Sequence, residues 1–339
     1  MGAHAEPGPH ITGQPTTTGD RTGSWVLDRY QLRRELHAGA TGELWLARER
    51  DSRELVVARL GLGPVRSERA RREGDVLVRL LHGGIPRLVE QGAIDGGWCV
   101  IAEHVEGAPL AKVLSVTNPS PPRAVGWARQ VALAVAQLHT AGVVHGDLHP
   151  GNVIIGRDDA GRDRMVLVGF GVATLDGVAP SRPGPVPHTA APELVRGEPA
   201  TPASDVYAIG AILYRMLVER WPFTGTEDDV RDAQIATPPP PLGRHAPSLR
   251  LPPGLEALVF RCLDKDPSAR VSSAEELAVA LGAVEFLPQR DWVRVEGSIA
   301  PAAPRERPAS SERGGVGWWA WFAGLAVVLI MALGWWLLG

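Results

Sequence analysis

Residues 145–152 read His-Gly-Asp-Leu-His-Pro-Gly-Asn, and residues 168–171 read Val-Gly-Phe-Gly. The first run brings a carboxylate, Asp147, and a carboxamide, Asn152, into one short polar stretch. The second run holds no acidic side chain, and its second residue is Gly169. The residues around these two runs decide which fold carries them and which chemistry remains.

The composition fits a globular body with a hydrophobic core, because 44% of the 339 residues are hydrophobic and 22% are charged. This length holds one large two-lobed domain or two ordinary ones. The net charge of -3 gives no general attraction to nucleic acid, so we expect no nucleic-acid partner. Cys99 and Cys262 lie in apolar runs without metal-ligand spacing, and we expect two buried free thiols.

The chain changes its hydrophobic pattern near residue 104. Short alternating apolar runs over 25–104 predict strands, with a hairpin through Leu44, Leu46 and 55–57. Within this part, 67–81 has helical spacing, and we expect its buried side to hold Val76, Leu77, Leu80 and Leu81. The following part is mostly helical, with predicted helices at 122–141, 204–219, 254–264 and 272–283.

Both ends of the chain differ from this body. Residues 1–24, rich in Gly, Pro and Thr, predict a disordered tail, and 284–316 predict a Pro- and Arg-rich linker. Residues 317–338 carry no charge and have Trp near both ends, which predicts a single transmembrane helix. A buried core helix is the alternative, but the linker offers it no partner core. Arginines precede the span and none follows it, so we expect the body in the cytoplasm and the C-terminus at the outer side.

The chain resembles the bacterial serine/threonine protein kinases over about residues 29–283. Residues 145–152 are similar to the kinase catalytic loop, and 168–171 stand at the place of its Asp-Phe-Gly motif. Further marks follow in the kinase order: Ala191-Pro192-Glu193, Ser204-Asp205-Val206 and Asp264 to Arg270. The resemblance implies an α+β, two-lobed protein-kinase-like fold, with a β-rich lobe at 25–103 and a helical lobe at 104–283.

The resemblance implies ATP as the cofactor and places its phosphates near two motifs. Gly39 and Gly42 belong to the glycine-rich loop, whose first glycine is His37 here. Arg59 stands at the place of the phosphate-binding lysine, and we expect it to pair with Glu73 of the next helix. The arginine fork is wider than a lysine ammonium, so it is poorly suited to hold the α and β phosphates in the same pose.

The hinge between the lobes corresponds to Glu103 through Val105, whose backbone groups bind adenine in the family. The small Ala102 leaves the back of that pocket open. Val57 replaces the alanine that usually lies above the adenine ring, so it narrows the pocket. One change therefore enlarges the adenine pocket, and the other makes it smaller.

In the catalytic loop, the resemblance makes Asp147 the acceptor of the substrate hydroxyl proton and Asn152 a magnesium ligand. Gly146 replaces an arginine that pairs with a phosphorylated activation loop, and His149 replaces a lysine. The loop also resembles small-molecule phosphotransferases such as the aminoglycoside kinases. The protein-kinase-like residues around Glu193 argue against that alternative.

Gly169 stands where the family has the aspartate that binds the magnesium bridging the ATP phosphates. Asn152 alone would remain as a ligand, so we do not expect magnesium to bind well. Asp158 and Asp163 precede the motif, and we expect both to be solvated. Val186 replaces a threonine that contacts the catalytic aspartate.

The structural positions, in contrast, are retained. We expect Glu193 to pair with Arg270 and Asp205 to support the large lobe. An apolar spine joins the lobes in the family, and its positions here are Leu77, Leu88, His145 and Phe170.

This pattern predicts a membrane-anchored pseudokinase that serves protein partners as a signalling scaffold or binding module. An active atypical serine/threonine kinase, which transfers the ATP γ-phosphate to protein hydroxyls, is the alternative. It rests on the presence of Asp147, Asn152 and Glu73.

Overall fold

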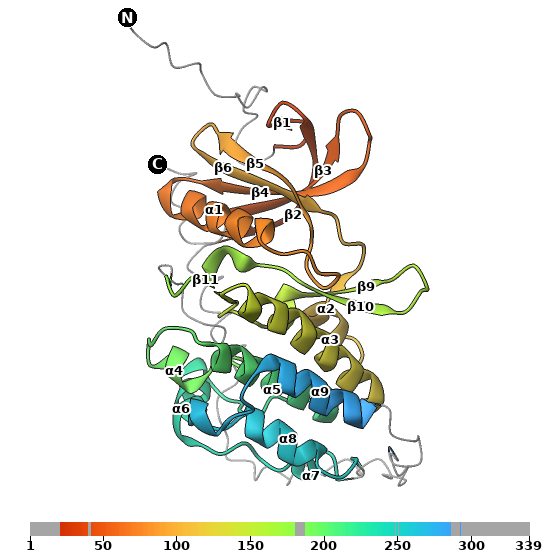
Figure 1. Ribbon diagram of the computed structural model, residues 1–339, viewed down its shortest axis with the longest axis vertical. Helices are drawn as coiled ribbons and strands as arrows, with labels where there is room; N and C mark the ends of the chain where they lie inside the picture. Colours follow the sequence, from red (N-terminus) through yellow and green to blue (C-terminus); the bar gives the residue numbers. More distant parts are fainter. Residues whose placement is uncertain are drawn as a thin grey trace, which may run out of the picture. The chain divides into compact units, whose positions relative to one another are not determined.

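The structure is a computed structural model, and it describes residues 21–39, 42–179, 187–247, 249, 251–285 and 292. The chain divides into two units, residues 1–295 and 296–339, and every described residue belongs to the first. Within this unit a β-rich small lobe precedes a helical large lobe (Figure 1), in agreement with the predicted α+β fold.

The small lobe is built on a six-stranded antiparallel sheet in the order β1-β2-β3-β4-β6-β5. The helix α1 (Pro64–Val78) connects β4 to β5 and packs against β4 and β6. The strands are β1 (Trp25–Val26), β2 (Tyr30–Gly39), β3 (Gly42–Glu49), β4 (Leu55–Leu62), β5 (Leu88–Ile94) and β6 (Gly97–Glu103).

Residue alternation explains how this sheet forms its own core. In β3, Trp45 and Ala47 are buried, whereas Leu44 and Leu46 are half-buried on the other face. The predicted hairpin is confirmed, because β3 pairs with β4 in antiparallel register. The core under the sheet also contains Tyr30, Leu32, Ala58, Leu60 and Ile101.

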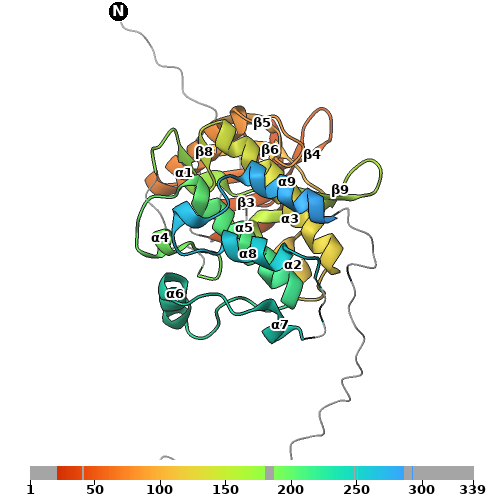
Figure 2. The same cartoon turned by 60° about the horizontal axis from the view of Figure 1, so that its bottom comes forward.

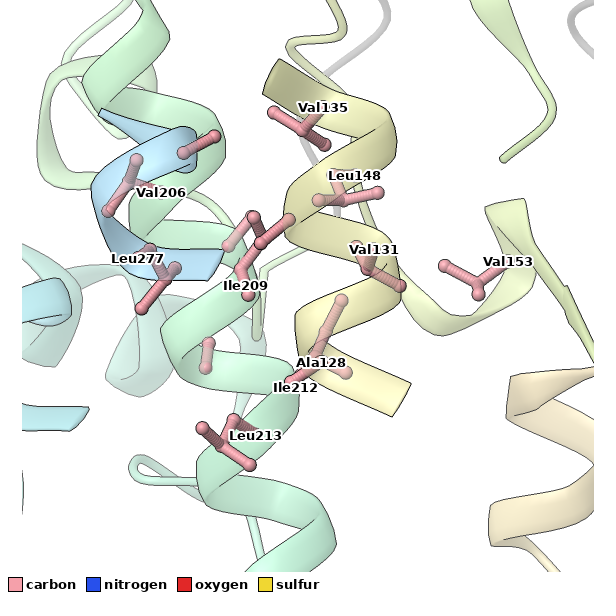
Figure 3. Packing of buried hydrophobic residues seen from close by; sticks show 14 of the residues in the cluster. Ala128, Val131, Val135, Leu148, Val153, Val206, Ile209, Ile212, Leu213 and Leu277 are labelled. Carbon is pink, nitrogen blue, oxygen red and sulfur yellow. The ribbon is translucent and has the colours of Figure 1, made fainter. Parts of the chain in front are cut away.

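The large lobe packs around α3 (Pro121–Thr140) and α5 (Pro202–Val218), and α9 (Ala274–Glu285) lies against α3 (Figures 1 and 2). Val131 of α3, Ile209 of α5 and Leu277 of α9 belong to one buried cluster (Figure 3). The other helices are α2 (Leu110–Leu114), α4 (Pro192–Val195), α6 (Glu227–Ala236), α7 (Leu242–His245) and α8 (Leu255–Cys262).

Short strands and turns flank the two sequence runs 145–152 and 168–171. The strands are β7 (Ala108–Pro109), β8 (Val143–Val144), β9 (Val153–Arg157), β10 (Asp163–Leu167) and β11 (Thr174–Leu175), and the 3₁₀ turns are η1 (Pro150–Asn152), η2 (Phe170–Val172) and η3 (Pro267–Ala269). The run 145–152 lies between β8 and β9, and the run 168–171 follows β10 directly. The pairing of β9 with β10 and of β8 with β11 therefore brings the two runs together.

One detail of the helix predicted at 67–81 is wrong. The helix begins earlier, at Pro64, and ends at Val78. Because the chain leaves the helix there, helical spacing no longer applies to Leu81, whose side chain is 91% exposed rather than buried. Val76 and Leu77 are buried as predicted.

The body extends slightly beyond the predicted boundaries. Gly23, within the predicted tail, donates its backbone N–H to the C=O of Leu32 (2.8 Å). Trp292, within the predicted linker, is buried with the large-lobe core. Among the described residues, no helix is long and apolar enough to cross a membrane, and the span predicted at 317–338 lies outside them. Cys99 and Cys262 are free and buried, as predicted.

Candidate active site

Asp205 of α5 holds the catalytic loop from the large-lobe side. Its carboxylate accepts the backbone N–H groups of His145 (2.9 Å) and Gly146 (2.8 Å), and lies 2.8 Å from Nε2 of His139. Burial acts to raise the pKa of Asp205, but the His139 hydrogen bond and the neighbouring charges outweigh it and lower that pKa. The carboxylate therefore stays ionised and fixes the backbone at the start of the loop.

His145 joins the two sequence runs. Its Nε2 donates to the C=O of Val168 (3.1 Å), because a carbonyl can only accept, and its Nδ1 accepts the N–H of Asp147 (3.3 Å). The imidazole ring also contacts Phe170, with 5.2 Å between ring centroids. The four predicted spine positions are buried or packed against the main core: Leu77, Leu88, His145 and Phe170.

Asn152 and His149 brace the loop around Asp147. The Asn152 side chain donates through Nδ2 to the C=O of Asp147 (2.9 Å). His149 accepts the N–H of Gly151 at Nδ1 (3.0 Å), and its Nε2 lies 3.9 Å from Oδ2 of Asp147. Burial lowers the pKa of His149, although the nearby Asp147 charge acts to raise it. At neutral pH this ring therefore does not supply the permanent charge of a lysine.

Gly169 adopts a left-handed backbone conformation, with φ 85° and ψ 41°. A β-carbon at this position would lie 2.5 Å from Oδ1 and 2.9 Å from Nδ2 of Asn152. The backbone of Asn152 is fixed to the same segment, because its C=O accepts the N–H of Val168 (2.9 Å). The Asn152 carboxamide thus occupies the space beside Gly169.

The residues present here do not fit a magnesium ion. Magnesium is held by carboxylate and other oxygens in a strict octahedral arrangement. Gly169 offers no side-chain ligand, which leaves the carboxamide oxygen of Asn152 without the carboxylate that would share the ion; Nδ2 of Asn152 donates to the C=O of Asp147. Across the described ranges, no group of three or more His, Cys, Asp or Glu side chains is placed to hold a metal.

The carboxylates of Asp158 and Asp163, which precede Gly169 in the chain, are bonded to other side chains. Asp163 on β10 accepts hydrogen bonds from Arg123 (2.6 Å) and from Nε1 of Trp127 (2.7 Å). The prediction that Asp163 is solvated is wrong, since its side chain is only 14% exposed. Its partners come from α3, which the local sequence around residue 163 does not reveal. Asp158 pairs with Arg162 (2.8 Å) within the β9–β10 hairpin.

An ion pair joins the small-lobe sheet to α1. Nε of Arg59 on β4 lies 2.5 Å from Oε2 of Glu73, and each side chain is 11% exposed. The predicted pair is confirmed. The guanidinium that stands in place of the lysine therefore keeps the ion pair between strand and helix.

Two further arginines, one on α1 and one in the turn after it, bind the segment after Phe170, and neither contact was predicted from the sequence. Arg72 donates to the C=O of Val178 (3.0 Å), and Arg79 donates to both carboxylate oxygens of Asp176 (3.0 and 2.8 Å). These partners are about 100 residues apart in the chain, and no local pattern marks them. They fix α1 against the start of that segment.

Arg270 and Glu193 form the predicted ion pair in the large lobe. Nη1 and Nη2 of Arg270 each donate to one carboxylate oxygen of Glu193 (2.8 Å), and the two side chains are 0% and 4% exposed. Ser204 donates to the same carboxylate (2.7 Å). The pair ties the loop after Asp264 to α4.

The family model for the protein kinase domain matches residues 30–280. The chain belongs to the bacterial serine/threonine protein kinases. Its relatives include serine/threonine-protein kinase pkn2 of Myxococcus xanthus, 35% identical over 280 residues, which cover 77% of this chain and 33% of the relative. Serine/threonine-protein kinase PknA of Mycobacterium tuberculosis is 32% identical over 302 residues, covering 84% of this chain and 68% of the relative.

The kinase PknJ of the same organism is 31% identical over 281 residues, covering 79% of this chain and 47% of the relative. The chain thus spans between a third and about half of the length of several of the relatives that it matches.

The strands that carry the predicted nucleotide-binding residues of the small lobe pair in the expected order. Gly39 ends β2 and Gly42 begins β3, and the two face each other across the hairpin, whose tip at 40–41 lies outside the described residues. Val57 and Ala102 are register partners on β4 and β6. The predicted valine and alanine therefore lie next to each other on adjacent strands of the sheet.

In the hinge of this kinase domain, the backbone N–H of Glu103 is hydrogen-bonded, whereas the backbone groups of Val105 are not. The N–H of Glu103 donates to the C=O of Arg87 (2.9 Å), so it is already used. The Glu103 carboxylate faces Arg164, with 3.6 Å between charged atoms. Within the described part of the chain, the backbone N–H and C=O of Val105 make no hydrogen bond. The backbone groups of Val105 are therefore not used by the described part of the fold.

Proposed function

We propose that this protein is a membrane-anchored pseudokinase that acts as a signalling scaffold or binding module for protein partners. The single observation that carries the proposal is at residue 169. A glycine stands there, and the carboxamide of Asn152 fills the space where a side chain would begin.

The chemistry of phosphoryl transfer supports this proposal. The reaction depends on positioning and on neutralising phosphate charge, and metal ions supply much of that neutralisation. Losing one well-placed electrostatic group costs on the order of 10²–10³ in rate. Here an arginine, Arg59, replaces the phosphate-binding lysine, His149 has a lowered pKa, and Gly169 has no carboxylate. The three departures all weaken the handling of phosphate or metal.

The contacts that hold the large lobe together also support this proposal. Asp205 fixes the loop backbone, and Arg270 with Glu193 fixes the large lobe, through contacts within the protein itself. A fold held by such internal contacts offers stable surfaces to partners. We therefore place the protein's activity in binding rather than in turnover.

The membrane anchor is part of the proposal and rests on residues 317–338, which contain no charged side chain. A charged residue in the middle of a span costs about 2.5–3.5 kcal/mol. Replacing Val328 and Leu329 with Arg should therefore release the chain from the membrane fraction of cells. The matched change of both residues to Ala should leave it membrane-bound, and equal release of the two variants would oppose the anchor.

The full chain, purified in detergent, tests the pseudokinase proposal directly. We expect no phosphate transfer to itself or to generic protein substrates with ATP and either Mg²⁺ or Mn²⁺. A thermal-shift titration with ATP should give the same result with and without Mg²⁺, since only a ligand that binds the folded state raises stability. Transfer that disappears in Asp147→Asn would overturn the proposal.

An active atypical serine/threonine kinase is the second candidate, and one observation favours it. Asp147 is present, and Asn152 donates to its carbonyl in an ordered loop. If this candidate is right, the phosphate-transfer assay should show a signal above that of Asp147→Asn. The same experiment therefore separates the two.

A further inference from the structure

A cavity of about 630 Å³ opens on the large lobe, between the end of the hinge, α2, the start of α3 and the β9–β10 hairpin. Its walls include Glu106, Val113, Pro119, Arg123, Ile155 and Arg157. None of its lining residues belongs to the runs 145–152 or 168–171. The cavity is therefore a different site from the kinase cleft.

Two arginines on one wall share a single carboxylate. Nε and Nη2 of Arg123 donate to Asp163 (2.6 and 3.0 Å), and Nη1 of Arg157 lies 2.8 Å from its Oδ1. Trp127 donates to the same carboxylate through Nε1 (2.7 Å). The Arg123 hydrogen bonds lower the pKa of Asp163, so it is ionised, and two positive charges meet one negative charge. This wall keeps one surplus positive charge.

Contacts within the protein fix both guanidinium groups at the cavity, where they can bind an anion. Arg123 is fixed over the ring of Trp127, with 4.8 Å between its Cζ and the ring centroid. Nη1 of Arg157 also donates to the C=O of Gly161 (3.1 Å). The two side chains are nevertheless 47% and 63% exposed, and a guanidinium has five N–H donors. Ordered arginines with remaining donors are suited to bind a carboxylate.

The rest of the cavity selects the kind of anion. Val113 and Ile155 are half-buried aliphatic side chains at the edge of the large-lobe core, and Pro119 is buried beside them. Glu106 lines the same cavity and makes no ion pair within the described ranges. Its charge opposes a second negative charge in so small a space. The walls therefore favour a single carboxylate that is flanked by aliphatic groups.

We propose that this cavity binds a peptide segment of a partner protein in which one Asp or Glu is flanked by aliphatic side chains. The carboxylate binds Arg123 and Arg157, and the aliphatic groups contact Val113 and Ile155. The proposal names a partner surface for the scaffold role, but it stands on the cavity alone. Its failure would leave the nucleotide experiments, which test the kinase cleft, unaffected.

A random-decapeptide display selection on the full chain in detergent tests the proposal. We expect the selected peptides to share an Asp or Glu next to Leu, Ile or Val. A fluorescein-labelled copy of a selected peptide, followed by fluorescence polarisation, should lose about tenfold or more in affinity when its acid is changed to the amide. Selection of uncharged or basic peptides, or no selection above background, would overturn the proposal.

Arg157→Gln is the decisive variant, because it removes the surplus charge and leaves Asp163 bonded to Arg123 and Trp127. It should weaken peptide binding about tenfold or more without changing the melting temperature. Val113→Glu, which puts a second negative charge on the aliphatic wall, should weaken binding as well. Arg162→Gln on the same hairpin, whose side chain is 79% exposed, is the matched control and should change affinity less than about twofold. Unchanged affinity in Arg157→Gln would refute the site.

Discussion

The carboxamide of Asn152 lies beside Gly169, 2.5 Å from the point that a β-carbon on residue 169 would occupy. The carboxamide is held there, because Nδ2 donates to the C=O of Asp147. The missing side chain has thus not left an empty metal site. A protein hydrogen bond lies next to the place where the family has a carboxylate.

Restoring the carboxylate should create a response to magnesium. In Gly169→Asp, the Asn152 carboxamide must move, so we expect a lower melting temperature without ligands. We expect Mg²⁺ with ATP to raise the melting temperature of this variant more than ATP alone, because the introduced carboxylate and Asn152 can then share the cation. Differential scanning fluorimetry on the full chain measures both effects.

Gly169→Ala is the control for this experiment. It carries the same backbone strain, which costs about 1–2 kcal/mol in the left-handed region, but it brings no ligand. It should be destabilised and should not respond to Mg²⁺. A response in wild type as large as in the Gly169→Asp variant would contradict our account of the site.

The ion pair between the sheet and α1 should matter for stability. Glu73→Gln removes the charge that faces Arg59 in a nearly buried place, and we expect a loss of about 3 kcal/mol in the free energy of unfolding. Glu68→Gln on the same helix is the control. Its side chain is 61% exposed and lies 3.8 Å from Arg72, so we expect less than about 0.5 kcal/mol. Urea titrations followed by circular dichroism compare the two, and similar losses would argue against a special role for Glu73.

Breaking the large-lobe ion pair should be more damaging still. Arg270→Ala leaves the Glu193 carboxylate buried without its main partner, and about 3–5 kcal/mol should be lost. Arg162→Ala removes an exposed ion pair with Asp158 and should cost less than about 1 kcal/mol. The same urea titration serves, and a loss under about 1 kcal/mol for Arg270→Ala would show that the lobe does not depend on this pair.

Acid should unfold the protein through Asp205 and Glu193. In the folded state both have a lowered pKa. Burial acts against this shift in each, but His139 and backbone N–H groups outweigh it for Asp205, and Arg270 with Ser204 outweighs it for Glu193. Their stabilisation is therefore complete above the unfolded pKa of about 4 and is lost as pH falls through the folded values.

We expect the free energy of unfolding to decline from about pH 5 downward. Asp205→Asn should flatten part of this decline, because it removes one of the two titrating groups. The check is a series of urea titrations between about pH 3 and pH 7. A constant free energy over that range would show that neither carboxylate carries the pH dependence.

Much of the site was predictable because motifs fix the register of neighbouring residues. Once Arg59 is placed on a strand and Glu73 on the next helix, the kinase fold brings them together, and the structure has them 2.5 Å apart. The pairing of Glu193 with Arg270 followed in the same way. These contacts depend on the backbone fold, and the motifs identify that fold.

Other contacts depend on side-chain directions that no motif specifies. The position of the Asn152 carboxamide beside Gly169 follows from a hydrogen bond within the folded loop. Arg79 meets Asp176 only because the end of α1 passes near the segment after Phe170. Leu81 was misplaced because the spacing does not show that the helix stops at Val78. Local patterns lose their meaning where an element ends.

Trp292 has a practical consequence for anyone who divides this chain. The family match stops at residue 280 and the last described helix at Glu285, so a cut just after α9 looks natural. Such a cut would remove an indole that is only 8% exposed, and emptying a comparable tryptophan position costs about 3–5 kcal/mol. A soluble fragment therefore has to keep residue 292. In assays on shorter fragments, weak binding or activity could then come from a destabilised large lobe and be ascribed wrongly to the nucleotide site.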